Sequence, residues 1–241
     1  MSTLDKTEYA IIVAGGKGTR IKSSVPKQFL ELNGIPVLIH TLNAFIRYSP
    51  EIKIILVLPQ NDMEIWKELS AKHNFTFPIT IQTGGDSRFQ SVKRGLEKIP
   101  GNGLVAIHDG VRPLVSEDLI RNSFRLAATH KTAVAAVALK ESIRMTDPPS
   151  AGETTRALDR SKFKLIQTPQ TFDVALIRKA YEGKEDASLT DDASVAEKAG
   201  HVISLFEGSY ENIKITTQED LVVAGALLKA RIRGAGADAR K

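Results

Sequence analysis

The stretch YAIIVAGGKGTR, residues 9–20, joins an apolar run to a loop of three glycines and two cations. A short apolar run that ends in glycines is typical of a buried strand. Glycines let backbone N–H groups approach a bound anion, and the cations add positive charge. The stretch therefore predicts a strand and then a phosphate-binding loop, although a tight turn with solvent-facing cations explains these residues equally well.

Two common phosphate-binding patterns do not fit this loop. A P-loop requires G-x-x-x-x-G-K-[ST], and no such spacing starts at Gly15 or Gly16. A dinucleotide fingerprint requires a third glycine where Ile21 stands, and an acidic residue about 20 residues further on, where the sequence reads IPVLIH. If the loop binds phosphate at all, its ligand is of a different kind, and Lys17, Arg20 and Lys27 are the candidate cations.

Apolar runs and amphipathic stretches alternate along the rest of the chain. This alternation predicts an α/β fold: a single Rossmann-like domain with a mainly parallel twisted sheet flanked by helices. Ligands of such folds bind at the carboxyl ends of the strands. The expected strands are residues 9–14, 52–59, 78–84, 104–110, 132–139, 201–208 and 212–217, and the expected helices include 62–73, 87–99 and 116–130.

One region interrupts the alternation. Residues 140–170 contain polar, strand-like segments around a Pro/Gly/Ser turn, which predicts a projecting β-hairpin arm that covers a ligand or embraces a second subunit. We therefore expect one domain over residues 1–230 with the arm inserted at about 140–170. Residues 231–241 are expected to form a flexible tail.

Composition narrows the functional classes. The 241-residue chain has no cysteine, which excludes disulfides, thiolate metal sites and a cysteine nucleophile. Its net charge of +5 comes from scattered cations without an aromatic-interleaved basic stripe, so we expect no nucleic-acid partner. No apolar run approaches the roughly 20 residues that span a bilayer, and the N-terminus does not resemble a secretory signal. We expect a cytoplasmic protein without membrane contact.

Two charged residues lie on predicted strands beside apolar neighbours. Asp109 ends an apolar strand, where a ligand-facing carboxylate is expected, although it could also cap the following loop. A carboxylate next to phosphates suits Mg²⁺ or another divalent cation. Lys214 stands between Ile213 and Ile215, so its side chain points away from both, toward the predicted ligand edge. His108, within the strand, is expected to be a packed, hydrogen-bonded residue.

A set of motifs then identifies a family. AGGKGTRI and PKQFLELNGIPVLIHTL resemble the signature of sugar-phosphate nucleotidyltransferases, and GGDSRFQSV, IHDGVRP, LDRSKFKLIQTPQTF, LTDDAS and NIKITTQEDL resemble 2-C-methyl-D-erythritol 4-phosphate cytidylyltransferases. These motifs run in the family's order from residue 10 to about 228. The resemblance implies transfer of CMP from CTP to 2-C-methyl-D-erythritol 4-phosphate with release of pyrophosphate, a step of the non-mevalonate isoprenoid pathway.

The resemblance also assigns roles to individual residues. The implied catalytic residues are Arg20, Lys27 and Lys214, and Asp109 is the implied metal ligand. The residues expected to bind CTP are Ala14, Gly15, Gly16, Gly18, Gly84, Gly85, Asp86, Ser91, Asp109 and Gly110. The residues expected to bind the sugar phosphate are Arg112, Ser142, Arg160, Thr168, Thr190 and Glu211.

Two of these positions depart from the family pattern. Relatives often have Thr where Ser142 stands, and many have Asp where Glu211 stands, so the sequence leaves open whether Glu211 meets the metal. Arg160 is expected to reach the site from a partner subunit, which makes the predicted assembly a homodimer through the arm. Two alternatives remain: a pentitol-phosphate (ribitol 5-phosphate) cytidylyltransferase, and a nucleotide-binding module without turnover.

Overall fold

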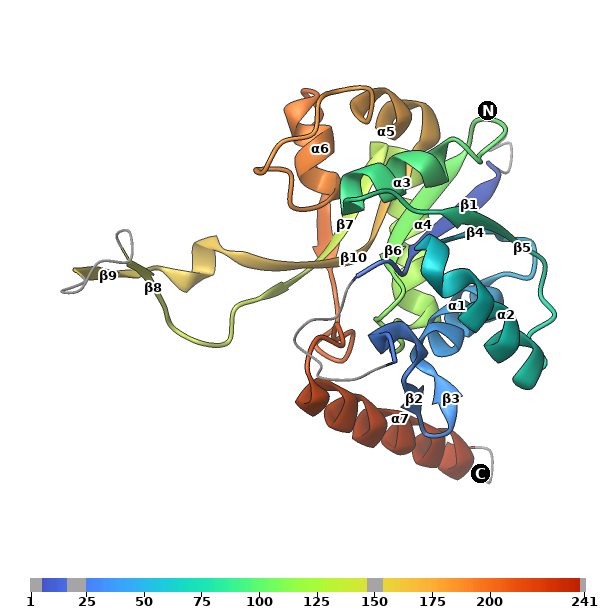
Figure 1. The fold of residues 1–241 in the computed structure, drawn as a ribbon. Coiled ribbons are helices and arrows are strands. Elements are labelled where there is room, and N and C mark those ends of the chain that lie inside the picture. Colours follow the sequence, from blue (N-terminus) through green and yellow to red (C-terminus); the bar gives the residue numbers. More distant parts are fainter. Residues whose placement is uncertain (1–5, 17–24, 147–153, 239–241) are drawn as a thin grey trace.

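A seven-stranded sheet lies at the centre of the computed structural model, which describes residues 6–16, 25–146 and 154–238 (Figure 1). The strand order is β11-β7-β10-β6-β1-β4-β5, and every pairing is parallel except those of β10, so the predicted mainly parallel α/β fold is confirmed. The strands are β1 (Glu8–Val13), β4 (Lys53–Leu58), β5 (Ile79–Thr83), β6 (Leu104–Asp109), β7 (Thr132–Ala138), β10 (Lys164–Asp173) and β11 (Leu205–Glu207).

Helices cover both faces of this sheet because the strands alternate their side chains between two apolar layers. Ala10 and Ile12 of β1 face one core, and Tyr9 and Ile11 face the other. The first layer contains α1 (Val37–Tyr48), α2 (Met63–Lys72) and α4 (Glu117–His130). The second contains α3 (Arg88–Leu96), α5 (Val174–Ala180) and α6 (Asp192–Lys198).

The prediction for residues 140–170 is only partly right. The hairpin of β8 (Ile143–Thr146) and β9 (Thr155–Leu158) projects from the domain as expected (Figure 1). Residues 164–170, however, begin β10, an antiparallel strand in the interior of the main sheet. The polar residues of β10 are buried because they have partners: Thr171 Oγ1 donates to Ser123 Oγ at 2.9 Å, and Gln170 Nε2 donates to Asp191 Oδ2 at 2.9 Å.

Two predictions near the C-terminus were also wrong. Residues 212–217 form no strand of the sheet; instead the Ile215 N–H donates to the Val111 carbonyl at 2.9 Å, which ties this segment to the loop after β6. The predicted tail begins inside a helix, because α7 (Gln218–Asp238) continues through residues 231–238. Asp220 and Thr217 form its N-terminal cap.

The remaining elements are short. They are the 3₁₀ turns η1 (Lys27–Phe29), η2 (Gln60–Asp62) and η3 (Arg160–Lys162), and the hairpin of β2 (Glu31–Leu32) and β3 (Ile35–Pro36). Leu32, Ile215 and Ala224 share a third apolar cluster between this hairpin and α7. The described part of the chain contains no helix long and apolar enough to cross a membrane.

Candidate active site

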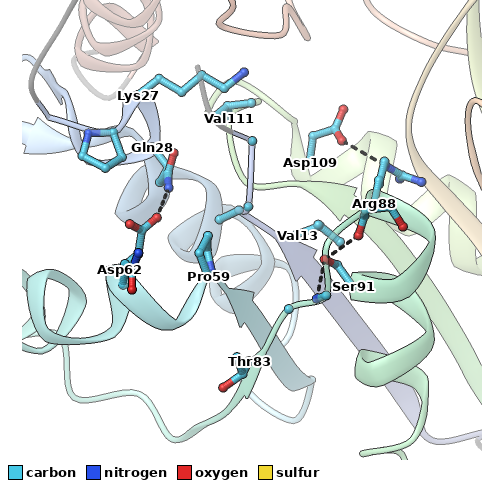
Figure 2. Close-up of a pocket in the computed structure, with 18 of the residues that line it drawn as sticks. Val13, Lys27, Gln28, Pro59, Asp62, Thr83, Arg88, Ser91, Asp109 and Val111 are labelled. Carbon is cyan, nitrogen blue, oxygen red and sulfur yellow. Dashed lines mark hydrogen bonds and ion pairs between the residues drawn. The ribbon is translucent and has the colours of Figure 1, made fainter. Parts of the chain in front are cut away.

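A cleft of about 940 Å³ opens beyond the carboxyl ends of β1, β4 and β6 (Figure 2). The central parallel strands end side by side at this edge, which is where an α/β sheet binds ligands. The cleft therefore forms where the sequence analysis expected it. Its lining includes Ala14, Gly15, Gly16, Lys27, Gln28, Asp62, Gly84, Gly85, Asp86, Arg88, Ser91, Asp109 and Lys214.

The described part of the glycine loop leaves β1 directly into this cleft. Ala14 N–H donates to the Val57 carbonyl at 3.0 Å, which keeps the start of the loop in line with the sheet. Lys27 returns over the loop after Pro26, and a Cβ added to Gly16 would lie 3.7 Å from Lys27 Nζ. The ammonium group therefore lies close to the loop, as the PKQ motif predicts. Gly18 and Arg20 lie outside the described residues.

Asp109 lies among three cations at the end of β6. Its Oδ2 is 3.1 Å from Arg112 Nε and 3.1 Å from Lys214 Nζ, while Oδ1 faces Arg88 Nε at 3.8 Å. Burial alone would raise the pKa of the Asp109 carboxyl, but Arg88, Lys214 and Arg112 outweigh it and hold the pKa well below its usual range. Asp109 is therefore a carboxylate at neutral pH.

This carboxylate fits a divalent cation. Mg²⁺ usually takes one or two protein carboxylates and completes its shell with substrate phosphates and water. Among the described residues no three acidic or histidine side chains gather as a metal site, so a protein-only cage is not formed there. Asp109, an ionised oxygen donor that lines the same cleft as Gly16 and Lys27, could hold such an ion together with a bound polyphosphate.

A tight turn between β5 and α3 also lines the cleft. Ser91 Oγ accepts from the Gly85 N–H at 3.1 Å and donates to the Ser87 carbonyl at 2.8 Å, while Ser87 caps α3. The Ser91 hydroxyl therefore shapes the loop. A Cβ on Gly84 would lie 2.9 Å from Ser91 Oγ, so this loop leaves no space for a side chain there. Asp86 also lines the cleft.

Gly85 provides a direct test of that crowding. A Cβ there would lie 2.4 Å from Gln90 Cβ, an atom near the backbone that cannot rotate away. We expect Gly85→Ala to displace the loop at a cost of about 1–3 kcal/mol, and to raise the Kd for CTP roughly tenfold or more in a calorimetric titration. Gly101→Ala is the control because nothing lies within 4 Å of its Cβ. Unchanged CTP binding by Gly85→Ala would contradict the assignment of this loop.

Gly110 and two of the predicted sugar-phosphate residues lie beneath the cleft. A Cβ on Gly110 would meet Ala14 Cβ at 2.9 Å, so Gly110 permits close packing of the ends of β1 and β6. Arg112 is buried, and its Nη1 donates to the Asn212 carbonyl at 2.8 Å. Thr168 Oγ1 accepts from the Asp109 N–H at 3.1 Å. In this chain Thr168 and Arg112 support Asp109.

The remaining sugar-phosphate residues are not brought to the cleft within one chain. Ser142, Arg160 and Thr190 are exposed, and Arg160 donates to the Lys140 carbonyl at the base of the arm. Glu211 forms an ion pair with Arg231 at 2.7 Å, so its carboxylate is directed to α7 and not to Asp109. The N-cap of α6 is Asp191, the residue that follows Thr190.

Several residues that shape the cleft were missed by the sequence analysis. Arg88 forms two hydrogen bonds with Asp192, and Gln28 Nε2 donates to Asp62 Oδ2 at 2.7 Å. Arg88 and Asp192 stand inside the family motifs GGDSRFQSV and LTDDAS, but their separation of 104 residues hid the pairing. His108 is packed as expected: burial lowers its pKa to about 3, so the ring is neutral.

The fold and the site together define a nucleotidyltransferase: a parallel α/β sheet whose carboxyl edge presents a glycine loop, lysines and a carboxylate in one cleft. The family is narrower. The chain belongs to the 2-C-methyl-D-erythritol 4-phosphate cytidylyltransferase family (IspD), whose model matches residues 9–230.

Individual relatives agree with this family. A 2-C-methyl-D-erythritol 4-phosphate cytidylyltransferase of Bacteroides thetaiotaomicron is 48% identical over 222 residues, which cover 92% of this chain and 99% of the relative. The crystal structure of 4-diphosphocytidyl-2C-methyl-D-erythritol synthase from Anaerococcus prevotii has a TM-score of 0.78 at 33% identity, covering 93% of this chain and 96% of the other. The crystal structure of 2-C-methyl-D-erythritol 4-phosphate cytidylyltransferase from Thermus thermophilus has a TM-score of 0.70 at 29% identity, covering 94% of this chain and 100% of the other.

Proposed function

We propose that the protein transfers CMP from CTP to 2-C-methyl-D-erythritol 4-phosphate and releases pyrophosphate. The observation that carries this proposal is the meeting of Lys27, Lys214 and Asp109 in one cleft beside the glycine loop. Two polyanionic reactants require positive charge and backbone donors where they meet, and this cleft supplies both. Family membership supports the same substrate pair.

In the proposed reaction an oxygen of the sugar phosphate attacks the α-phosphorus of CTP. A new P–O bond forms there, and the bond from the α-phosphorus to the bridging oxygen of the β-phosphate breaks, so pyrophosphate leaves with that electron pair. The attacking monoester is ionised near neutral pH, so no protein base has to remove a proton. The neutral His108 ring, buried beneath the cleft, is not required to act as one.

The chain's own residues bind and orient the reactants. Gly15 and Gly16 admit the triphosphate to the loop, and Lys27 places a compact charge beside it. Lys214 is partly exposed to the cleft and neutralises phosphate oxygens at the reacting centre. A divalent cation held by Asp109 and the phosphates would add further charge neutralisation at the α-phosphate. Arg20 is proposed to join Lys27 because of its place in the motif.

We also propose that a second subunit completes the sugar-phosphate pocket. Ser142, Arg160 and Thr190 are exposed in a single chain, whereas a phosphate with a polyol tail requires guanidinium and hydroxyl donors together. Phe163, Leu165 and Ile166, at the base of the arm, expose 41–53% of their surface, which is consistent with a surface covered in a homodimer. The cytoplasmic location stays a prediction from the sequence.

A mixing experiment tests the contribution of the partner. Lys27→Ala and Arg160→Ala are each expected to be nearly inactive alone. If Arg160 acts across the interface, a heterodimer of the two variants has one intact site of two, so random pairing is expected to recover about a quarter of wild-type activity. No recovery after dissociation and joint reassembly, with dimers present by ultracentrifugation, would show that Arg160 serves its own chain or no site.

The proposed reaction is tested by pyrophosphate release. The protein is incubated with CTP and Mg²⁺, and either 2-C-methyl-D-erythritol 4-phosphate, ribitol 5-phosphate or no acceptor. Release only with 2-C-methyl-D-erythritol 4-phosphate supports the proposal. Release chiefly with ribitol 5-phosphate would show that the protein is a pentitol-phosphate cytidylyltransferase instead. Tight CTP binding without release from either acceptor would indicate a nucleotide-binding module.

A further inference from the structure

Arg88 lies between two carboxylates: Asp109, which lines the cleft, and Asp192, which is fully buried. Its guanidinium forms a two-point contact with Asp192, from Nη1 to Oδ1 at 2.8 Å and from Nη2 to Oδ2 at 2.6 Å. On the other side its Nε remains 3.8 Å from Asp109 Oδ1, longer than a hydrogen bond (Figure 2). Arg88 is therefore bound to Asp192 and only near Asp109.

The position of Asp192 is set by several contacts. The residue is the first of α6 and is fully buried. Tyr181 OH donates to Asp192 Oδ1 at 2.6 Å, so this oxygen accepts from both Tyr181 and Arg88. Gln170 of β10 fixes the start of α6 from the other side, because its Oε1 accepts from the Ala193 N–H at 2.8 Å. Asp192 is thus a rigid anchor for the guanidinium.

The contact between Arg88 and Asp192 determines which carboxylate oxygen of Asp109 is accessible from the cleft. Asp109 Oδ2 already has Arg112 and Lys214 at 3.1 Å. Oδ1 accepts no hydrogen bond from a side chain of the described residues, and Arg88 Nε stands 3.8 Å from it. A guanidinium released from Asp192 would need to move by only about an ångström to reach hydrogen-bond distance from Oδ1. It would then occupy the oxygen of Asp109 that accepts no hydrogen bond from the side chains of the described residues.

We propose that Asp192, supported by Tyr181, is a positioning residue that holds Arg88 back from Asp109 and thereby keeps Asp109 Oδ1 available to a divalent cation. Asp192 acts through Arg88 and does not touch the substrate. The inference rests on the proposed binding of a divalent cation at Asp109. A purely structural alternative exists: the pair would only join α3 to α6, and its loss would lower stability without changing cation binding.

The test compares Asp192→Asn with the double variant Arg88→Gln/Asp192→Asn. The single variant leaves Arg88 without its carboxylate, so we expect the Kd for Mn²⁺ in the presence of saturating CTP to rise roughly tenfold, by electron paramagnetic resonance of free Mn²⁺. The double variant removes the competing cation, so the Kd is expected to return to within about threefold of wild type. Asp186→Asn, an exposed acid paired with Lys198, is the control.

A crystal structure of Asp192→Asn provides a readout that does not depend on the metal. We expect Arg88 to have moved to hydrogen-bond distance from Asp109. An unmoved Arg88, or equal Mn²⁺ affinities for the single variant and the wild type, overturns the inference, and so does a double variant that binds Mn²⁺ no better than the single one. If wild-type protein binds no Mn²⁺ with CTP, the proposed metal role fails, and the position of Arg88 in the variant still decides whether Asp192 restrains it.

Discussion

Replacing Lys27 with alanine is expected to lower kcat roughly 100- to 1,000-fold, as the loss of one preorganised charge at a transition state does. The ammonium lies beside Gly16 at the mouth of the glycine loop, where charge develops as pyrophosphate leaves. Because the loop amides still hold the ground-state triphosphate, the Kd for CTP should change by only a few-fold. Steady-state kinetics and calorimetry with CTP measure the two quantities separately.

Two further variants make this expectation specific. Lys27→Arg keeps the charge but replaces a compact ammonium with a planar guanidinium group. We therefore expect its kcat to lie between those of the wild type and Lys27→Ala. Lys67→Ala removes an exposed lysine of α2 that pairs with Glu64, and it should leave kcat and the melting temperature unchanged. A Lys27→Ala enzyme that turns over at the wild-type rate would remove Lys27 from the catalytic set.

Asp109→Asn is expected to cause the second large effect. The substitution preserves shape but removes the carboxylate that Arg88, Arg112 and Lys214 surround. We expect kcat to fall roughly 1,000-fold and Mg²⁺ to stop strengthening CTP binding, because an amide oxygen is a far weaker ligand than a carboxylate. Without Mg²⁺ the variant should bind CTP at least as tightly as wild type, since the uncompensated cations attract the triphosphate.

The stability of this variant separates loss of chemistry from loss of fold. In this variant Arg88 retains its hydrogen bonds to Asp192, and Arg112 retains its hydrogen bond to the Asn212 carbonyl. We therefore expect the free energy of unfolding to fall by about 3 kcal/mol or less, the lower end of the range for breaking a buried ion pair. Asp118→Asn, an exposed acid of α4, is the matched control. Wild-type Mg²⁺ dependence in a folded Asp109→Asn protein would show that another group binds the cation.

Local patterns were enough to predict much of the site. The apolar runs of β1 and β6 end at the glycine loop and at Asp109, and parallel strands bring such ends to one edge. The alternation around Lys214 predicted that its side chain reaches the same edge, and its ammonium lies 3.1 Å from Asp109. The prediction for Lys214 depended only on the direction of its side chain. That direction is correct even though residues 212–217 form no strand of the sheet.

The central strand β10 shows where local patterns failed. Gln and Thr side chains are unusual in an interior strand, so residues 164–170 were predicted to belong to the arm. Burial of such residues depends on whether partners meet them in the folded protein, as Ser123 of α4 meets Thr171. Those partners lie far away in the chain, so no window of sequence reveals them.

The sequence by itself determined the α/β class, the glycine loop after β1, and the placement of Lys27, Asp109 and Lys214 at one edge of the sheet, because strand and turn preferences act over a few neighbouring residues. Only the tertiary structure decided that Arg88 binds Asp192 and stops short of Asp109, that Glu211 pairs with Arg231, and that Arg160 donates to the Lys140 carbonyl. Ion pairs form wherever folding brings opposite charges to within a few ångströms, and that distance is a property of the packed chain.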